Sequence, residues 1–214
     1  MFIQILFEDP LFASWWLLVV VFSICSHEYG HALMAKLQGD TTAQEQGHLS
    51  LNPLQQMGIT SLITLLLLGF AWGAVPVNPS RMRHKYSRLL VSLAGVTMNL
   101  LLFWLFVIAA VVCSIFWPGS EAIHLMGIGA TLNALLFIFN SLPIPPLDGF
   151  TALTAAFPAL GKRFNQATNK EVVAGMTLFL FLGMLVFGMR YIVGIAEFLT
   201  NFAMGLLMLI LGVE

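Results

Sequence analysis

Two histidines and a glutamate form an H-E-x-x-H motif inside an apolar stretch of the chain. They are His27, Glu28 and His31, and residues 11–25 before them carry no charge. On a helix, residues i and i+4 share a face, so the two imidazoles can bind one metal ion. Glu28 is then placed to take a proton from a metal-bound water. The spacing predicts a zinc-dependent hydrolase whose active site lies in the lipid bilayer.

A pair of hydrogen-bonded core histidines is the alternative interpretation of this motif. That alternative leaves Glu28 unexplained, because a carboxylate at membrane depth is expensive to bury without a partner. The nearest cation in the sequence, Lys36, lies two helical turns further on and can extend to the membrane surface. We therefore favour the metal site.

The composition describes a membrane protein. Hydrophobic residues make up 59% of the 214 residues, charged residues only 9%, and the mean hydropathy is +0.91. Soluble domains carry about 25% charge. We expect an all-α polytopic membrane protein with about five to six transmembrane helices. The long apolar segments are residues 11–37, 89–117, 122–147, 172–189 and 191–213.

The domain organisation follows from the same pattern. We expect one integral membrane domain over residues 1–214, with a core at 11–150 and accessory transmembrane helices at 171–213. The first apolar segment follows Glu8 and Asp9 rather than basic residues, which argues against a signal peptide. Cys25 and Cys113 are isolated in apolar runs, so no disulfide framework is expected, and Cys25 is interpreted as a packing residue.

The distribution of cations predicts the orientation in the membrane. Seven of the nine lysines and arginines form two clusters, residues 81–88 and 162–170. By the positive-inside rule both clusters face the cytoplasm. The loop at residues 118–121 has no cation and is expected outside, as is the acidic N-terminus.

This orientation constrains the apolar segment at residues 57–75. The helix from residue 11 enters from outside and the helix from residue 89 starts in the cytoplasm, so the segment between them must not change sides. It either dips into the membrane and returns, or crosses and comes back in extended form. Non-helical backbone at membrane depth needs protein or a watery cavity to satisfy it. Residues 72–79 are therefore expected beside the active-site cleft.

Two histidines and a water leave a tetrahedral zinc one ligand short. The candidates are His48, His124 and Asp148. Asp148 ends a proline-rich decapeptide, residues 140–149, in which free carbonyls and extended backbone are expected. It is equally suited to cap a helix over residues 151–156. Local sequence alone leaves these two roles open.

Three stretches together resemble the site-2 protease family of intramembrane zinc metalloproteases. They are the H-E-x-x-H helix at residues 26–32, the Gly-x-x-x-Asn of residues 93–99 and the N-x-x-P-x-P-x-L-D-G segment at residues 140–149. Residues 47–54 and 76–79 also resemble loops of small members of the family. The chain is similar to a small, single-domain member without a PDZ or CBS domain.

The resemblance implies a complete site. One Zn²⁺ per chain would be bound by His27, His31 and Asp148, with Glu28 as the catalytic glutamate. Asn140 matches a position thought to hold the substrate or the oxyanion. The implied protein is a multi-pass protein of a prokaryotic inner membrane that acts on transmembrane proteins in the bilayer. No nucleic acid is expected as a partner, and a homo-oligomer or a regulatory membrane partner stays open.

Some residues depart from the family pattern. Residues 55–58 replace a His-Ile-Asp-Pro-like run, Val96 stands where a proline is usual, and His48 stands where an arginine is common. None of these is a proposed zinc ligand. They concern the loop conformation and the handling of substrate, not the binding of zinc.

The predicted function is hydrolysis of transmembrane segments by a metal-activated water, with residues 75–79 pairing with an unwound substrate by strand addition. A non-catalytic zinc-binding scaffold or chaperone is the alternative, but it would not need Glu28. A metal transporter would need polar residues across the bilayer, and the later helices lack them. Glu197 is the one further intramembrane acid, and we interpret it as facing a neighbouring helix.

Overall fold

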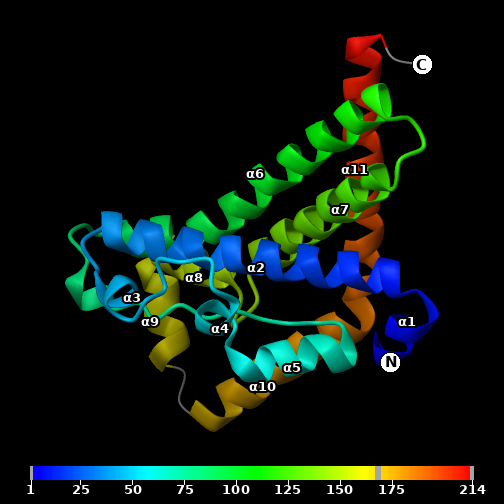
Figure 1. Ribbon diagram of the computed structural model, residues 1–214. Coiled ribbons are helices and arrows are strands. Elements are labelled where there is room, and N and C mark those ends of the chain that lie inside the picture. Colours follow the sequence, from blue (N-terminus) through cyan, green and yellow to red (C-terminus); the bar gives the residue numbers. More distant parts are fainter. Residues whose placement is uncertain (1, 167–169, 213–214) are drawn as a thin grey trace.

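The molecule is a set of packed helices of very different lengths (Figure 1). The computed structural model describes residues 2–166 and 170–212, and every regular element within them is helical. The elements in chain order are α1 (Phe2–Glu8), α2 (Pro10–Leu37), α3 (Thr42–Glu45), α4 (Pro53–Gln56), α5 (Gly58–Leu68), a 3₁₀ turn (Pro79–Arg81), α6 (Ser87–Phe116), α7 (Glu121–Ser141), α8 (Asp148–Ala156), α9 (Pro158–Gln166), α10 (Lys170–Gly183), a π-helical turn (Met184–Gly188) and α11 (Met189–Leu211).

The predicted all-α polytopic membrane fold is confirmed. In the described part of the chain, four helical runs are long and apolar enough to cross a bilayer: α2, α6, α7 and the run Thr177–Leu211. A span needs about 20 apolar residues. The number is below the expected five to six because two of the apolar segments in the sequence do not form separate spans.

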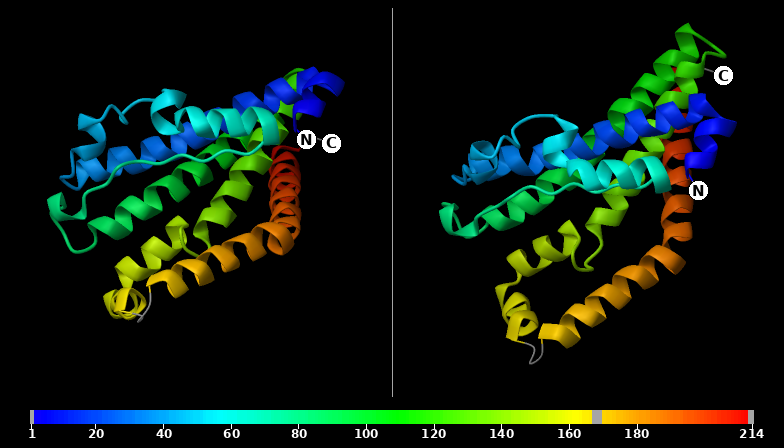
Figure 2. Two further views of the ribbon diagram at one scale, coloured as in Figure 1. Left: turned by 90° about the horizontal axis from the view of Figure 1, so that it is seen from below. Right: turned by 60° about the horizontal axis from the view of Figure 1, so that its bottom comes forward.

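The last two apolar segments, residues 172–189 and 191–213, belong to one continuous helical run. No chain reversal separates α10 from α11; a π-helical turn joins them, and the two helices meet at an angle there (Figure 2). The sequence has no proline at this point, so backbone hydrogen bonding continues through Arg190. Residue 213 lies outside the described residues.

The apolar segment at residues 57–75 also does not form a transmembrane span. Its helix, α5, has 11 residues and is about 16 Å long, too short for about 30 Å of hydrocarbon. α5 ends at Leu68, and the next residue, Gly69, has a φ of +82° that suits glycine. Phe2 packs against Gly69. Trp16 Nε1 donates to the Gly69 carbonyl at 2.9 Å. The chain then returns in extended form along α2 (Figure 1), so the segment dips in and returns.

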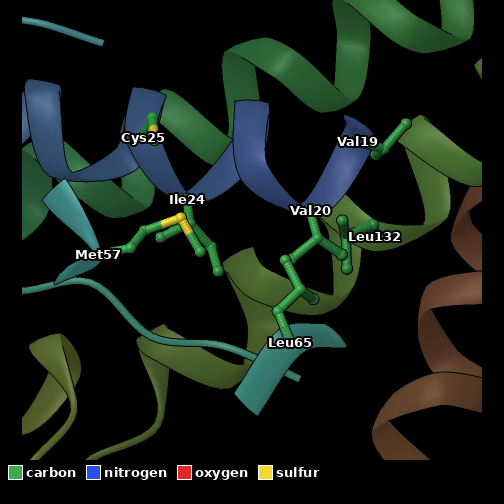
Figure 3. Packing of buried hydrophobic residues seen from close by; sticks show 7 residues of the cluster. All are labelled: Val19, Val20, Ile24, Cys25, Met57, Leu65 and Leu132. Carbon is green, nitrogen blue, oxygen red and sulfur yellow. The ribbon is translucent and has the colours of Figure 1, made fainter. Parts of the chain in front are cut away.

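A hydrophobic cluster holds α5 and α7 against α2 (Figure 3). Its buried members are Val19, Val20, Ile24, Cys25, Met57, Leu65 and Leu132. Within a bilayer such contacts stabilise by close packing rather than by removal from water. The predicted packing role of Cys25 is confirmed.

α6 is the central helix and contacts α2, α7, α8 and α11. The end of α2 is joined to the start of α6, since Arg83 N donates to Gln38 O at 3.0 Å and Ser87 Oγ donates to Gln38 Oε1 at 2.8 Å. Lys36 and the basic cluster at residues 81–88 therefore lie at one end of the molecule. The α6–α7 loop lies at the other end of α6, an arrangement that the predicted orientation requires. The side chains of Arg163 and Lys170 lie outside the described part.

The expectation for Glu197 was wrong. α11 packs against α7 and α6 with a face that includes Ile192, Ala196 and Thr200, all buried. These residues recur every four positions, as one face of a helix does. Glu197 follows Ala196 by about 100° around the helix, and its side chain is exposed.

Candidate metal centre

α2 carries the whole H-E-x-x-H motif without interruption. The helix starts at Pro10, after an N-cap in which Asp9 accepts from Phe12 N, and it continues for 28 residues. Both histidines lie on one face, with their Nε2 atoms 3.0 Å apart and their rings edge to face at 83°. His27, Glu28 and His31 are all buried.

Two glycines let α6 approach this face of α2 closely. A Cβ on Gly30 would lie 3.0 Å from the Ala94 carbonyl oxygen. A Cβ on Gly95 would lie 2.6 Å from His27 Nε2 and closer still to His31 Nε2. Small residues at helix contacts in membranes permit such an approach. Gly95 therefore leaves room in front of both Nε2 atoms that any other residue would fill.

Asp148, the first residue of α8, follows the loop between α7 and α8 and lies beside the two Nε2 atoms. Its Oδ2 lies 3.0 Å from His27 Nε2 and 3.1 Å from His31 Nε2. A Cβ on Gly149 would overlap the Ser141 carbonyl, so α8 packs directly on the end of α7. The residue that precedes α8 is Leu147, and no side chain caps this helix. The alternative role of Asp148 as a helix cap is therefore not what the structure shows.

The hydrogen bonds of the histidines determine which nitrogens are free. His27 Nδ1 lies 2.5 Å from Asn99 Oδ1, and His31 Nδ1 lies 2.7 Å from the Val91 carbonyl oxygen. Both neighbours are acceptors, so each Nδ1 carries the proton and each Nε2 presents a lone pair. With the Asp148 oxygen, three electron pairs converge on one point.

This convergence fits a zinc ion. The three atoms are 3.0 to 3.1 Å apart, and tetrahedral ligands at about 2.0–2.1 Å from zinc are about 3.3 Å apart. Nitrogen and carboxylate oxygen are ligands that zinc accepts, and Nδ1–H bonds of this kind orient metal-binding histidines. Among the described residues, these three side chains form the group whose ligand atoms meet closely enough for a metal.

Glu28 faces the extended segment at residues 70–78 and is not part of the three-residue group. A Cβ on Gly73 would lie 2.5 Å from Glu28 Oε1. The backbone of the segment therefore passes directly over the carboxylate. Gly73, which belongs to the range 72–79 predicted to lie beside the site, is therefore next to Glu28.

Two polar side chains hold the first half of this segment. Ser61 Oγ donates to Trp72 O at 2.6 Å and accepts from Trp72 N at 2.9 Å. Ala74 N donates to Gln56 O at 3.0 Å, and the buried Gln56 side chain donates to the carbonyls of His48 and Ser50. The departure from the family pattern at Gln56 thus has a structural role in fastening this loop.

Asp40 holds the far end of the segment. Its Oδ2 accepts from Asn78 N at 2.6 Å, and its Oδ1 accepts from the backbone N and hydroxyl of Thr42. Burial raises the pKa of the Asp40 carboxyl, but these hydrogen bonds outweigh burial, so its pKa lies below the ordinary value.

The other candidate residues lie apart from the group of three. His48 Nδ1 is 3.3 Å from Gln56 Oε1, and His124 is exposed near the start of α7. Asn140 lies in the last turn of α7, ahead of the proline-rich loop, and its side chain makes no hydrogen bond to the described residues. Its role stays a prediction.

Sequence reasoning missed two polar residues that connect to the site. Asn133 on α7 and Ser23 on α2 are completely buried and reach His27 through Asn99. Asn133 itself could have indicated this, because a lone amide in an uncharged transmembrane run is costly to bury unless it has a hydrogen-bond partner. Asn99 belongs to the Gly-x-x-x-Asn motif, but the motif alone does not predict its contact with His27.

Comparison with known proteins also indicates a zinc metalloprotease. Residues 117–184, which include Asp148, match the model of Peptidase family M50. The chain is 34% identical over 174 residues to "Putative zinc metalloprotease YwhC" of Bacillus subtilis, covering 76% of this chain and 78% of that protein.

It is also 36% and 33% identical to proteins named "Putative zinc metalloprotease Rip2" of Mycolicibacterium smegmatis and Mycobacterium tuberculosis. Those matches cover 61% and 74% of this chain but only 52% and 63% of the two relatives. No solved structure gives a significant match. The chain therefore belongs to peptidase family M50, the site-2 protease family, and is a zinc metalloprotease.

Proposed function

We propose that this metalloprotease cleaves the transmembrane segments of membrane proteins, with His27, His31 and Asp148 as the zinc ligands and Glu28 as the general base. The observation that carries the proposal is the position of the ligand group. Two of its members and Glu28 are buried in α2, one of the helices able to cross a bilayer. A substrate that reaches this site must come from within the membrane or from its edge.

Each group at the site has a separate proposed role in hydrolysis. When bound, zinc would polarise a carbonyl oxygen and lower the pKa of water. Glu28 takes the proton from the attacking water and returns it to the leaving amine. Asn140, whose amide is not engaged by the described residues, is proposed to donate to the developing oxyanion.

The extended segment supports binding of the substrate as a strand. The N–H groups of residues 72, 74 and 78 bond inward to the protein, whereas those of residues 73, 75 and 77 bond to none of the described residues. The backbone N–H groups of successive residues in a strand point to opposite edges, so those of the odd-numbered residues form a free edge. Pro76, which lacks an N–H, falls on the inward side. An unwound substrate could pair with this edge beside Glu28.

The alternative is a zinc-binding scaffold without catalysis. Such a protein needs the three ligands but has no use for a carboxylate beside them. Glu28 is buried at the site and forms no salt bridge with any described residue. Its burial costs free energy that a proton-transfer role explains and a scaffold does not.

The test compares the wild type with Glu28→Gln on candidate single-span membrane proteins in reconstituted vesicles. Glutamine keeps the size of the side chain but cannot act as a base, so cleavage should fall by about 10²- to 10⁴-fold. Zinc content should stay near that of the wild type. Glu45→Gln is the matched control, since Glu45 is exposed on α3 and pairs with Arg81. Wild-type cleavage by Glu28→Gln would remove Glu28 from the mechanism, and loss of zinc would make it structural.

A further inference from the structure

A chain of buried polar side chains runs from His27 away from the site and into the helix bundle. Its members are Asn99 on α6, Asn133 on α7 and Ser23 on α2, each with 0% of its surface exposed. Buried amides are costly unless they are hydrogen-bonded. Each one here has a partner, and a backbone carbonyl beside Asn133 determines which atom donates in the bonds that link it to His27.

The direction is set by a backbone carbonyl on α7. Asn133 Nδ2 lies 2.9 Å from Gly129 O and 2.9 Å from Ser23 Oγ. A carbonyl oxygen only accepts, so the amide nitrogen of Asn133 must face it. The reverse orientation would place two oxygens against each other. Asn133 Oδ1 is thereby turned toward Asn99.

The orientation of Asn133 in turn determines those of Asn99 and His27. Asn99 Nδ2 donates to Asn133 Oδ1 at 3.1 Å, which leaves Asn99 Oδ1 facing His27 Nδ1. An oxygen acceptor at this position requires a proton on Nδ1. The lone pair of His27 is then on Nε2, the atom that faces His31 and Asp148.

We propose that Asn133 is a positioning residue for the metal site: acting through Asn99, it fixes the proton of His27 on Nδ1 and keeps Nε2 free for the metal. His31 needs no such relay, because its Nδ1 bonds directly to the Val91 carbonyl. The two histidines of the motif are thus prepared in different ways, one by a backbone group and one by two amides. The inference rests on the proposed function only in taking His27 as a ligand.

The experiment replaces Asn133 by Leu, which leaves Asn99 free to turn. The tautomer of His27 is read in the metal-free protein from the ¹⁵N shifts of labelled histidine, and the His27→Ala spectrum assigns the signal. We expect a population with the proton on Nε2, which the wild type lacks. Zinc affinity, measured by competition with a chelator, should fall about 10- to 100-fold, as is typical when a partner of a metal-binding histidine is lost.

Three further variants keep the test specific. Thr131→Val removes another interhelical hydrogen bond of α7, from Thr131 Oγ1 to Thr200 Oγ1, that has no link to His27. It should change neither the tautomer nor the zinc affinity. Asn133→Asp should behave like the wild type, because the hydrogen-bond partners of this position, Ser23, Gly129 and Asn99, carry no charge and burial there favours a neutral carboxyl group, which can donate to Gly129 O while accepting from Asn99. Asn133→Ala is measured as well, in case Leu disturbs folding.

The outcomes separate this inference from the proposed function. If folded Asn133→Leu or Asn133→Ala shows the wild-type tautomer and zinc affinity, the relay is refuted. Equal losses in Thr131→Val would show that any lost contact in α7 weakens the site, and would also refute it. If His27→Ala itself keeps full zinc affinity, the ligand assignment fails, while the tautomer measurement still decides the relay.

Discussion

Replacement of Gly95 by Ala tests the central feature of the site, the close passage of α6 in front of the two histidines. The added Cβ would lie 2.6 Å from His27 Nε2, whereas ordinary contacts begin at 3.4 Å. The ring must therefore move by about 3.4 − 2.6 = 0.8 Å. His27 is buried and its Nδ1 is held by Asn99, so it has little freedom to move.

The magnitude follows from the tolerance of metal sites. Ligand distances in zinc sites hold to about ±0.2 Å, so the required movement is several times larger than the site can absorb, and it affects both histidines. Loss of a hydrogen-bond partner of a metal-binding histidine alone lowers metal affinity by about 10- to 100-fold. We therefore expect Gly95→Ala to lower zinc affinity by more than about 100-fold, or about 2.7 kcal/mol. The fold should lose about 1–3 kcal/mol from the overpacking.

The assay is zinc affinity by chelator competition, with thermal unfolding to show that the variant is folded. Gly127→Ala is the matched control, because Gly127 lies on α7 and a Cβ there meets nothing within 4 Å. It should bind zinc like the wild type. A folded Gly95→Ala protein with wild-type zinc affinity would refute the packing of α6 against the histidines.

Asp148→Ala should lose most of its bound zinc and His48→Ala should retain it, since Asp148 Oδ2 is 3.0 Å from His27 Nε2 while His48 bonds to Gln56; metal analysis with the opposite result would reassign the third ligand. The depressed pKa of Asp40 implies stability that is present above the unfolded pKa of about 3.9 and is lost as pH falls through the lower folded pKa. The difference in thermal stability between wild type and Asp40→Asn should thus be constant above about pH 4 and shrink in more acidic buffer, whereas a difference that grows with acid would contradict the assigned sign. Cysteine introduced at Ser120 should be labelled from outside and cysteine at His84 from the cytoplasm, and labelling of both from one side would overturn the orientation.

Much of the site could be predicted because its first part is local. His27, Glu28 and His31 lie within five residues of one helix, and the period of a helix alone brings the two imidazoles to one face. The membrane location follows equally from composition, since uncharged runs of this length match the thickness of the hydrocarbon layer. The balance of helices that enter and leave the bilayer predicted that residues 72–79 come back beside the site, but it left open whether residues 57–75 dip into the membrane or cross it.

Other features depended on contacts between distant residues. Asp148 is 117 positions from His31, and its local sequence was equally compatible with a helix cap, so the expectation that it binds zinc came from the family resemblance. In the folded chain Gly149 packs on the end of α7, and the carboxylate of Asp148 lies beside the histidines. Glu197 is another example, because the face that α11 presents to α7 depends on how the two helices fit together, which periodicity does not specify.

By itself, the sequence determined that the chain crosses a membrane, that α2 presents two imidazoles and a carboxylate, and that zinc chemistry is the interpretation that accounts for them. These are properties of single helices, which hydropathy and a period of about 3.6 residues decide. The family resemblance supplied Asp148 as the third candidate ligand, and the tertiary structure alone showed its carboxylate beside the two histidines, the place where α5 turns back, and the contact of two amides from α6 and α7 with His27. The physical reason is that a hydrogen bond or a ligand contact between helices depends on their separation and rotation to within a fraction of an ångström, and these come from the packing of small residues such as Gly95 and Gly149.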